Sequence, residues 1–439
     1  MNLYILNKKM TNEKNKDYDD KLFSKRNNCR LCEHQNLELV VPLNPTPVAE
    51  KYILKDDLSK KEPVCPLDLY MCLNCGHVQL LDIVEPNFLY SDYTYSSGTS
   101  KGLVDHFETY VNNICKIYNP DKNSLVVDVG SNDGTLLKFF KEKGLKVLGV
   151  DPAEEIASKA TKEGIPTMPN FFNLELSNEI LDKYGSASIV TANNAFAHMD
   201  NLDEIMSGIK NLMNKSSVFV FEISYLVDVV DKVLLGTIFH EHHSYHSIKP
   251  LVLFFKKYHM EIIRVERNNI QGGSLIGVAQ FVDGKFEKDK SIEQILKLEE
   301  IKEITKTKTL KKFSEDLKTT KKNINSLLEK INSENNTIAG FGAARSGTTL
   351  IMQMQIAKYI KFIVDDNKFK QGKYSPGSHI LVKPTDYIYE NKPDFLIILA
   401  WVHSKNIIRN HKKFLDQGGH FIVCFPKLKI ITKNNINEL

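Results

Sequence analysis

Two Cys-x-x-Cys motifs, CRLC at residues 29–32 and CLNC at residues 72–75, constrain the fold of this chain most strongly. Each motif bends into a knuckle that directs two thiolates at one point, and two knuckles complete a closed tetrahedral zinc shell. The count of 7 cysteines is odd, which disfavours a disulfide framework. We therefore expect a structural Zn²⁺ ion, because four thiolates leave no open coordination position; its ligands are Cys29, Cys32, Cys72 and Cys75.

The rest of the chain alternates short apolar runs with helical patterns, which predicts an α/β protein with parallel sheets covered on both faces. A length of 439 residues predicts two or three domains. We expect a small N-terminal zinc module, a central Rossmann-like domain and a second, C-terminal Rossmann-like domain. The predicted boundaries are a flexible tail at 1–26, the zinc module at 27–95, the central domain at 96–284, a helical connector at 285–336 and the C-terminal domain at 337–439.

Charge and hydropathy exclude several classes of partner. The net charge is only +4, and the surplus of lysine falls in the connector, so we expect no nucleic acid partner. No apolar run reaches the roughly 18 residues that span a membrane, and the N-terminus lacks the pattern of a secretory signal. We expect a cytoplasmic protein that is a monomer or a weak oligomer.

A glycine-containing turn, VVDVGSNDGT at residues 126–135, predicts a nucleotide site. The glycines let a ligand approach the backbone at a helix N-terminus, and Asp151 ends the next strand, where a carboxylate can hold both hydroxyls of a ribose. The turn lacks the full dinucleotide spacing and is closer to the S-adenosylmethionine loop of class I methyltransferases. Phe171 or Phe172 is a candidate to cover the adenine. The predicted cofactor-binding residues are Asp128, Gly130, Asn132, Asp133, Gly134, Asp151, Phe171 and Asn193.

The next strand end carries Asn193, Asn194 and His198, which we expect to face the ligand crevice of the sheet. Enzymes that methylate exocyclic amines of nucleobases typically carry an Asn/Asp-Pro-Pro-aromatic run at this place. The chain has none there, which disfavours a nucleobase substrate.

FHEHHSYHS, at residues 239–247, contains four histidines. It is open to three interpretations: a metal site, histidines with no role in the reaction, or a catalytic base with its support. The His-x-His-His spacing suits a metal poorly. The third interpretation fits best, with His242 as the base and Glu241 orienting it, because imidazole titrates near neutrality.

These motifs together resemble the sugar C-methyltransferases of deoxysugar biosynthesis. The resemblance covers about residues 27–430, and its markers are CRLC, CLNCGHVQLLD, YSDYTYSSGTS, VVDVGSNDGTLL, GVDPA, NNAFAH, HEHHSYHS, QGGSL, GFGAARSGTTL, VDDNKFKQGKYSPGSHI and LAWVH. It implies a nucleotide-linked 4-keto sugar (dTDP-, GDP- or CDP-linked) as substrate, with S-adenosylmethionine as methyl donor. The active-site residues implied by the resemblance are Tyr93, Asn194, His198, Glu241 and His242.

Two departures from the family pattern concern the substrate. Phe239 stands where the family usually has a tyrosine, and His403 stands where it commonly has asparagine. We expect substrate binding by Tyr93, Asn194 and His198, and by Arg345 and His403 of the C-terminal domain. Methylation of a sugar carbon after removal of a proton beside the ketone is the expected reaction. The alternatives are an O- or N-methyltransferase on the same scaffold and, more distantly, a zinc-ribbon protein that modifies or binds RNA.

Overall fold

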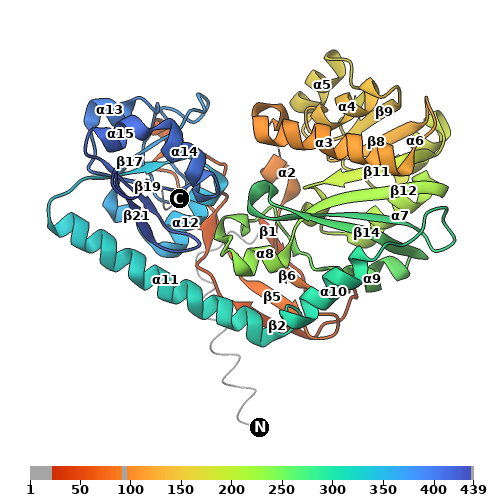
Figure 1. Cartoon of the computed structure of the whole chain (residues 1–439), viewed down its shortest axis with the longest axis horizontal. Helices are drawn as coiled ribbons and strands as arrows, with labels where there is room; N and C mark the ends of the chain where they lie inside the picture. Colours follow the sequence, from red (N-terminus) through yellow and green to blue (C-terminus); the bar gives the residue numbers. More distant parts are fainter. Residues whose placement is uncertain (1–21, 91–95, 437–439) are drawn as a thin grey trace, which may run out of the picture.

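The computed structural model describes residues 22–90 and 96–436. Three sheets of four or more strands organise these residues, one in each of the expected zinc, central and C-terminal regions, and two further sheets have two strands each. Figure 1 shows the central sheet and the C-terminal sheet side by side, with the N-terminal strands below and between them. No helix in the described part of the chain is both long and apolar enough to cross a membrane.

The N-terminal sheet has the strand order β13-β6-β5-β2, and one of its strands comes from the distant FHEHHSYHS stretch. Its members are β2 (Leu37–Val41), β5 (Leu69–Cys72), β6 (Val78–Leu80) and β13 (Ser244–Tyr245). The strand β1 (Phe23–Lys25) pairs with β7 (Asp82–Val84), so strand structure begins inside the segment expected to be a flexible tail. The short strands β3 (Thr46–Pro47) and β4 (Val64–Cys65) form a separate pair.

The central domain is a seven-stranded sheet of order β10-β9-β8-β11-β12-β15-β14. The first five strands are parallel, and β15 runs antiparallel to both of its neighbours. The strands are β8 (Leu125–Val129), β9 (Lys146–Val150), β10 (Thr167–Met168), β11 (Ala187–Asn193), β12 (Met213–Ser224), β14 (Met260–Asn268) and β15 (Ser274–Phe281).

Helices cover both faces of this sheet because its strands are apolar on both sides. Along β8, Val126 packs with helices α3 and α4, whereas its neighbour Val127 belongs to the cluster that includes α6, α7 and α9. The helices are α3 (Lys101–Tyr118), α4 (Thr135–Glu142), α5 (Glu154–Lys162), α6 (Leu174–Tyr184), α7 (Leu202–Leu212), α8 (Leu226–Asp231) and α9 (Ile248–Lys256), with the short α2 (Pro86–Tyr90) before them.

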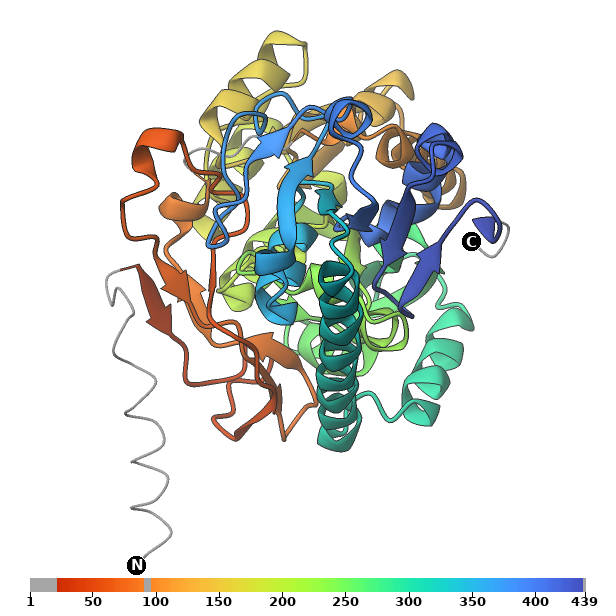
Figure 2. The ribbon, with the colours of Figure 1, turned by 90° about the vertical axis from the view of Figure 1, so that its left-hand side faces the viewer.

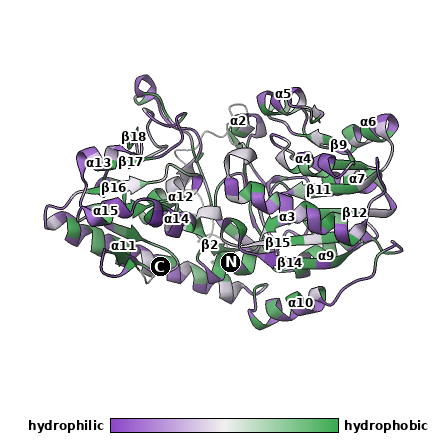
Figure 3. Ribbon diagram, turned by 45° about the horizontal axis from the view of Figure 1, so that its top comes forward, coloured by the Kyte–Doolittle hydropathy of each residue, from purple (hydrophilic) through white to green (hydrophobic). Residues whose placement is uncertain are grey.

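Two helices form the link to the C-terminal domain, α10 (Ser291–Ile301) and α11 (Thr307–Ser333). The long helix α11 contacts β2 and ends just before the C-terminal sheet, as Figures 1 and 2 show. Figure 3 shows green, hydrophobic residues along the central strands and purple, hydrophilic residues along the outer face of helices such as α11. The lysine-rich stripe of α11 is therefore a solvated helix face.

The C-terminal domain is a six-stranded sheet of order β18-β17-β16-β19-β20-β21, parallel except for β21. Its strands are β16 (Ile338–Phe341), β17 (Ile360–Val364), β18 (Val382–Lys383), β19 (Phe395–Ile398), β20 (His420–Val423) and β21 (Lys429–Ile431). Its helices are α12 (Arg345–Met354), α13 (Tyr387–Asn391), α14 (Ser404–Asn410) and α15 (Lys412–Asp416). The expected α/β class, with a small N-terminal module followed by two Rossmann-like domains, is confirmed.

Candidate active site

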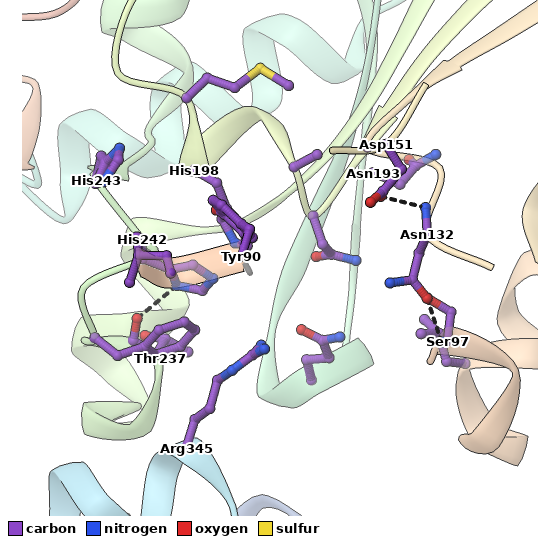
Figure 4. A pocket seen from close by; sticks show the side chains of 18 of the residues that line it. Tyr90, Ser97, Asn132, Asp151, Asn193, His198, Thr237, His242, His243 and Arg345 are labelled. Atoms are coloured by element: carbon purple, nitrogen blue, oxygen red, sulfur yellow. Dashed lines mark hydrogen bonds between the residues drawn. The ribbon is translucent and has the colours of Figure 1, made fainter. Parts of the chain in front are cut away.

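A cavity of about 920 Å³ lies between the central and C-terminal domains. Its walls come from the strand ends of the central sheet, from the residues around His242 and from the start of α12. Figure 4 shows His198 and His242 on one side, Asn132 and Asp151 on the other, and Arg345 reaching in from α12. This is the carboxyl edge of a parallel sheet, where such folds bind ligands.

The Asp151 end of the cavity fits a nucleoside. The Asp151 carboxylate lines the cavity and accepts hydrogen bonds from the backbone N–H groups of Asn132 at 2.8 Å and Ala153 at 2.9 Å. Burial raises the pKa of Asp151 above its ordinary value, and these two hydrogen bonds oppose that shift. Gly130 has a φ of +79°, and a Cβ there would lie 2.5 Å from the Cβ of Ala195, so the turn requires glycine. These residues fit S-adenosylmethionine, with Asp151 placed to hold the ribose.

Three predicted cofactor residues shape this turn without lining the cavity. Asp128 is buried and accepts a hydrogen bond from the Thr191 hydroxyl at 2.6 Å, and burial raises its pKa to about 7. Asp133 accepts hydrogen bonds from the backbone N–H of Gly98 at 2.8 Å and from Thr135, and Gly134 is the N-cap residue of α4, with a φ of +75°. Their role in cofactor binding stays a prediction. Phe171, which is 46% exposed, and the buried Phe172 both line the cavity.

Asn193, Asn194 and His198 all line the cavity, at the end of β11. Asn194 has a left-handed φ of +53°, held by the hydrogen bond from its N–H to the Glu222 carbonyl at 2.8 Å. Such strain in a non-glycine residue is typical of functional sites. Nε2 of His198 is buried with no hydrogen-bond partner among the described residues. Burial lowers the pKa of His198 well below its usual range, so the ring is neutral.

His242 presents one ring nitrogen to the cavity. Its Nδ1 lies 2.7 Å from the carbonyl oxygen of Thr237, which can only accept, so Nδ1 carries the proton and Nε2 has the free lone pair. The ring centroid lies 4.8 Å from that of His198 and 4.0 Å from that of Phe239. Burial lowers the pKa of His242 to about 4. The arrangement is that of a neutral, oriented general base.

Of the other three histidines in FHEHHSYHS, two have contacts away from the cavity and one lines it. Nε2 of His240 lies 3.3 Å from the Cys65 carbonyl oxygen, away from the cavity. The His246 ring stacks between His77 and Phe196, at centroid distances of 5.2 and 5.4 Å. His243 lines the cavity beside His242, and no sequence pattern distinguished it from the other histidines.

Glu241 occupies a different place from the one we expected. The atom that orients His242 is the Thr237 carbonyl oxygen, whereas the buried Glu241 carboxylate faces Arg345, with Oε1 3.5 Å from Nε. The same Arg345 Nε lies 3.6 Å from Oε1 of Glu50 in the N-terminal region. Burial raises the pKa of Glu241, and the Arg345 charge opposes this. A catalytic role for Glu241 would therefore act through Arg345.

The C-terminal domain contributes Arg345 and His403 to the cavity, as the sequence predicted, together with Trp401, which it did not. The Arg345 guanidinium carbon lies 5.5 Å from the Phe239 ring centroid, so Phe239 packs between the cation and the His242 ring. Burial lowers the pKa of His403. Tyr93 lies outside the described residues, whereas the nearby Tyr90 lines the cavity.

The zinc site has the expected geometry. The four sulfur atoms of Cys29, Cys32, Cys72 and Cys75 lie within 4.8 Å of one another. Pairs of them approach to 3.6 Å (Cys29 with Cys75) and 3.5 Å (Cys32 with Cys72), which suits the shared coordination of one ion. Gly76 follows the second knuckle with a φ of +82°, a turn that favours glycine. Four thiolate ligands fit Zn²⁺ in a closed, structural site.

Comparison with known proteins agrees with this fold. Family models match residues 29–90 (a zinc binding domain), 108–265 (a methyltransferase domain) and 269–426 (a C-methyltransferase C-terminal domain). The chain is therefore an S-adenosylmethionine-dependent methyltransferase with a zinc-binding N-terminal domain. The chain is also 30% identical over 405 residues to the C-methyltransferase NovU of Streptomyces niveus, covering 92% of this chain and 96% of that protein. It belongs to the C-methyltransferase family, as the sequence predicted.

Solved structures match part of the chain. They include magnesium protoporphyrin IX methyltransferase from Synechocystis with bound SAH (17% identity, 41% of this chain, 84% of that chain, TM-score 0.32). Another is an S-adenosylmethionine-dependent methyltransferase from Clostridium acetobutylicum (13% identity, 45% of this chain, 96% of that chain, TM-score 0.34).

Proposed function

We propose that this C-methyltransferase acts on a nucleotide-linked sugar with a ketone at C4, and that His242 removes the proton from the carbon beside the ketone. A ketone acidifies the adjacent C–H bond because the electron pair left behind delocalises onto oxygen. The resulting enolate carbon is nucleophilic. S-adenosylmethionine, when bound at the Asp151 end of the cavity, supplies a methyl group activated by the positive charge of its sulfur.

The observation that carries this proposal is the state of His242. Its Nδ1–H is held by the Thr237 carbonyl at 2.7 Å, and the other nitrogen remains available in the cavity that Asp151 also lines. A base that must accept a proton from carbon needs this tautomer and a fixed orientation.

The low pKa of His242, about 4, keeps the base unprotonated but also makes it weak. An enolate that forms beside the ring would favour the imidazolium and raise that pKa during the reaction. Asn194 and His198 lie on the same wall and are placed to donate hydrogen bonds to sugar oxygens, including the enolate oxygen. The neutral His198 fits this role because it adds no competing charge beside His242.

The start of α12 supports binding of the nucleotide end of the substrate. Its first residue, Arg345, lines the cavity, and free N–H groups at a helix N-terminus favour anions. We assign to this end the diphosphate of a dTDP-, GDP- or CDP-linked sugar, with His403 nearby as a further polar group. A role for Tyr93 in sugar binding stays a prediction.

Replacement of the base tests the proposal. The variant His242→Asn should lower kcat by at least about 10²-fold while the Kd for S-adenosylmethionine stays within about twofold, because general-base catalysis contributes roughly 10²–10⁴-fold. Turnover would be followed with methyl-¹³C-labelled donor and a dTDP-linked 4-keto-6-deoxy sugar. The carbon NMR shift of the product distinguishes a methyl group on carbon from one on oxygen or nitrogen.

His240→Asn is the matched control, because His240 belongs to the same motif but bonds to the Cys65 carbonyl outside the cavity. It should keep kcat within about threefold, the scatter expected of a residue without a role in proton transfer. Near-normal turnover by His242→Asn would remove His242 as the base.

A further inference from the structure

Arg30, inside the first zinc knuckle, is the most unusual charged residue of the molecule. Its side chain is 0% exposed, and it lies between two metal-ligating cysteines in the sequence CRLC. Burial of a guanidinium is costly unless hydrogen bonds and charges compensate it. The partners that compensate Arg30 therefore indicate what the residue holds in place.

One set of partners leads to the proposed base. Nη1 of Arg30 donates to the carbonyl oxygen of His243 at 3.3 Å, and also to the carbonyl oxygen of Leu80 and to Oε1 of Gln79 at 3.3 Å, both in β6. His243 directly follows His242 in the chain. The next two residues form β13, which pairs with β6 in the register Ser244 with Gln79. The loop that carries His242 thus continues as an edge strand of the sheet in the zinc module.

The other partner leads to the loop of His198. Nε of Arg30 donates to Oδ1 of Asp200 at 3.0 Å, and Asp200 lies two residues after His198 and lines the cavity. Arg26 also bonds to Asp200, at 3.1 Å from Nη1 to the carboxylate. The Arg26 side chain, however, is partly exposed, and it bonds to Asp200 and to the Asn28 carbonyl rather than to the His242 loop.

We propose that Arg30 is a positioning residue for methyl transfer, which joins the His198 loop and the His242 loop through one guanidinium anchored in the zinc knuckle. The importance of the spacing between these two rings rests on the proposed function, in which His242 removes the proton and His198 holds the sugar oxygen. Only the planar fork of arginine can point Nε at Asp200 and Nη1 at the His243 carbonyl at the same time. The knuckle that binds zinc therefore also sets the geometry of the proton transfer.

Amide hydrogen exchange of the substrate-free holoenzyme, with its zinc bound, tests the coupling. In Arg30→Lys the charge remains but the fork is lost, so residues 196–201 and 239–246 should both exchange at least about tenfold faster, while β16 of the C-terminal domain stays unchanged. Arg26→Lys is the matched control and should leave residues 239–246 at the wild-type rate. Wild-type exchange of residues 239–246 in Arg30→Lys would overturn the proposal.

Kinetics supply the second readout. With the dTDP-linked 4-keto sugar, Arg30→Lys should lower kcat by about 10²-fold, the effect of a misplacement of about 1 Å, with KM and the Kd for S-adenosylmethionine within about twofold. An unchanged kcat in zinc-replete Arg30→Lys would also overturn the proposal that Arg30 is a positioning residue. If Arg30→Lys does not fold with its zinc, the variant Asp200→Asn tests the proposal instead, because it keeps an oxygen acceptor but loses the charge. Residues 196–201 should then exchange faster than in the wild type, and kcat should fall with KM unchanged. Wild-type exchange and wild-type kcat in Asp200→Asn would overturn the proposal.

The two hypotheses fail separately. If His242→Asn keeps its turnover, the proposed function is wrong, whatever the exchange experiment shows. If His242→Asn is inactive but Arg30→Lys has wild-type exchange and kcat, only the positioning role is wrong.

Discussion

The central and C-terminal domains contain the same local construction, a strand, a glycine turn and a helix, followed by a second strand that ends in aspartate. In the central domain Asp151 accepts a hydrogen bond from the N–H of Asn132 at 2.8 Å. In the C-terminal domain Asp365 accepts one from the N–H of Ala343 at 2.6 Å. A carboxylate therefore ties the turn to the neighbouring strand in both domains.

The two turns differ in what they present to the shared cavity. The central turn presents the Asp151 carboxylate, whereas Asp365 is absent from the lining residues, and the C-terminal turn presents Arg345 instead. One end of the cavity thus offers a carboxylate for ribose hydroxyls beside a positively charged cofactor, and the other offers a cation suited to a diphosphate. The comparison teaches that the same backbone turn can serve different ligands, because the cavity receives the side chain that follows β9 in one domain and the first side chain of α12 in the other.

The largest effect should come from Asp151, with Asp365 as its matched control. Asp151→Ala should weaken S-adenosylmethionine binding by roughly 30-fold, about 2 kcal/mol, because hydrogen bonds to a charged group are lost. Asp365→Ala removes the equivalent carboxylate and should leave that Kd unchanged. Titration calorimetry with the purified holoenzyme measures both, and equal losses in the two variants would show that the turns are interchangeable in cofactor binding.

A smaller effect is expected at the other end of the cavity. Arg345→Met should weaken binding of dTDP by about tenfold, since a charge-assisted hydrogen bond contributes roughly 1.5–3 kcal/mol. Lys370→Met is the control, because Lys370 pairs with Glu50 as Arg345 does, at 2.9 Å, but does not line the cavity. An unchanged Kd for dTDP in Arg345→Met would place the nucleotide elsewhere.

The smallest expected effect is a change of kcat/KM with pH. It should involve His242 of the central domain and not Arg345 of the C-terminal domain. Because burial lowers the pKa of His242 to about 4, the neutral base persists in mild acid, and kcat/KM should lose only about a tenth from this group between pH 7 and pH 5. An ordinary histidine would lose most of its activity over that interval. Binding of a dTDP-linked sugar should change little, because its diphosphate has no group that titrates in this interval and Arg345 keeps its charge. A fall in kcat/KM centred near pH 6.5 would contradict the buried base.

Thermal stability should also depend on pH, through two neighbours of His242, and it must be measured in parallel with the kinetics. Burial lowers the pKa values of His240 and His243 to about 4 and about 3. As the pH falls, these histidines therefore bind protons in the unfolded chain before they do so in the folded protein. Stability that these histidines contribute is complete above about pH 6.5 and is lost as pH falls toward the folded values. The thermal midpoint should therefore decrease between pH 6.5 and pH 4.

Features fixed by local chemistry could be predicted from the sequence. The four cysteines have few alternatives to a shared metal, and the apolar runs that became β8, β9 and β11 are buried as such runs must be. Cavity residues at strand ends, such as Asn194 and Asp151, followed from the polarity of a parallel sheet.

Features that depend on distant backbone could not be predicted. The partner of His242 is the carbonyl oxygen of Thr237, and a backbone acceptor leaves no mark in a side-chain pattern. The burial of Arg30 depends on Asp200 and the His243 carbonyl, which lie 170 and 213 residues away in sequence. The prediction for Tyr93 remains untested, because that residue lies outside the described ranges.

The strand β13 has a consequence for how the protein is made. The N-terminal sheet lacks its edge strand until the ribosome has synthesised Ser244 and Tyr245, so the first region to be translated is among those that finish folding late. Until then the edge of β6 offers unpaired backbone groups to other chains. A fragment that stops before residue 244 should therefore be prone to aggregate, and the zinc module cannot be transplanted to another enzyme as a self-contained unit.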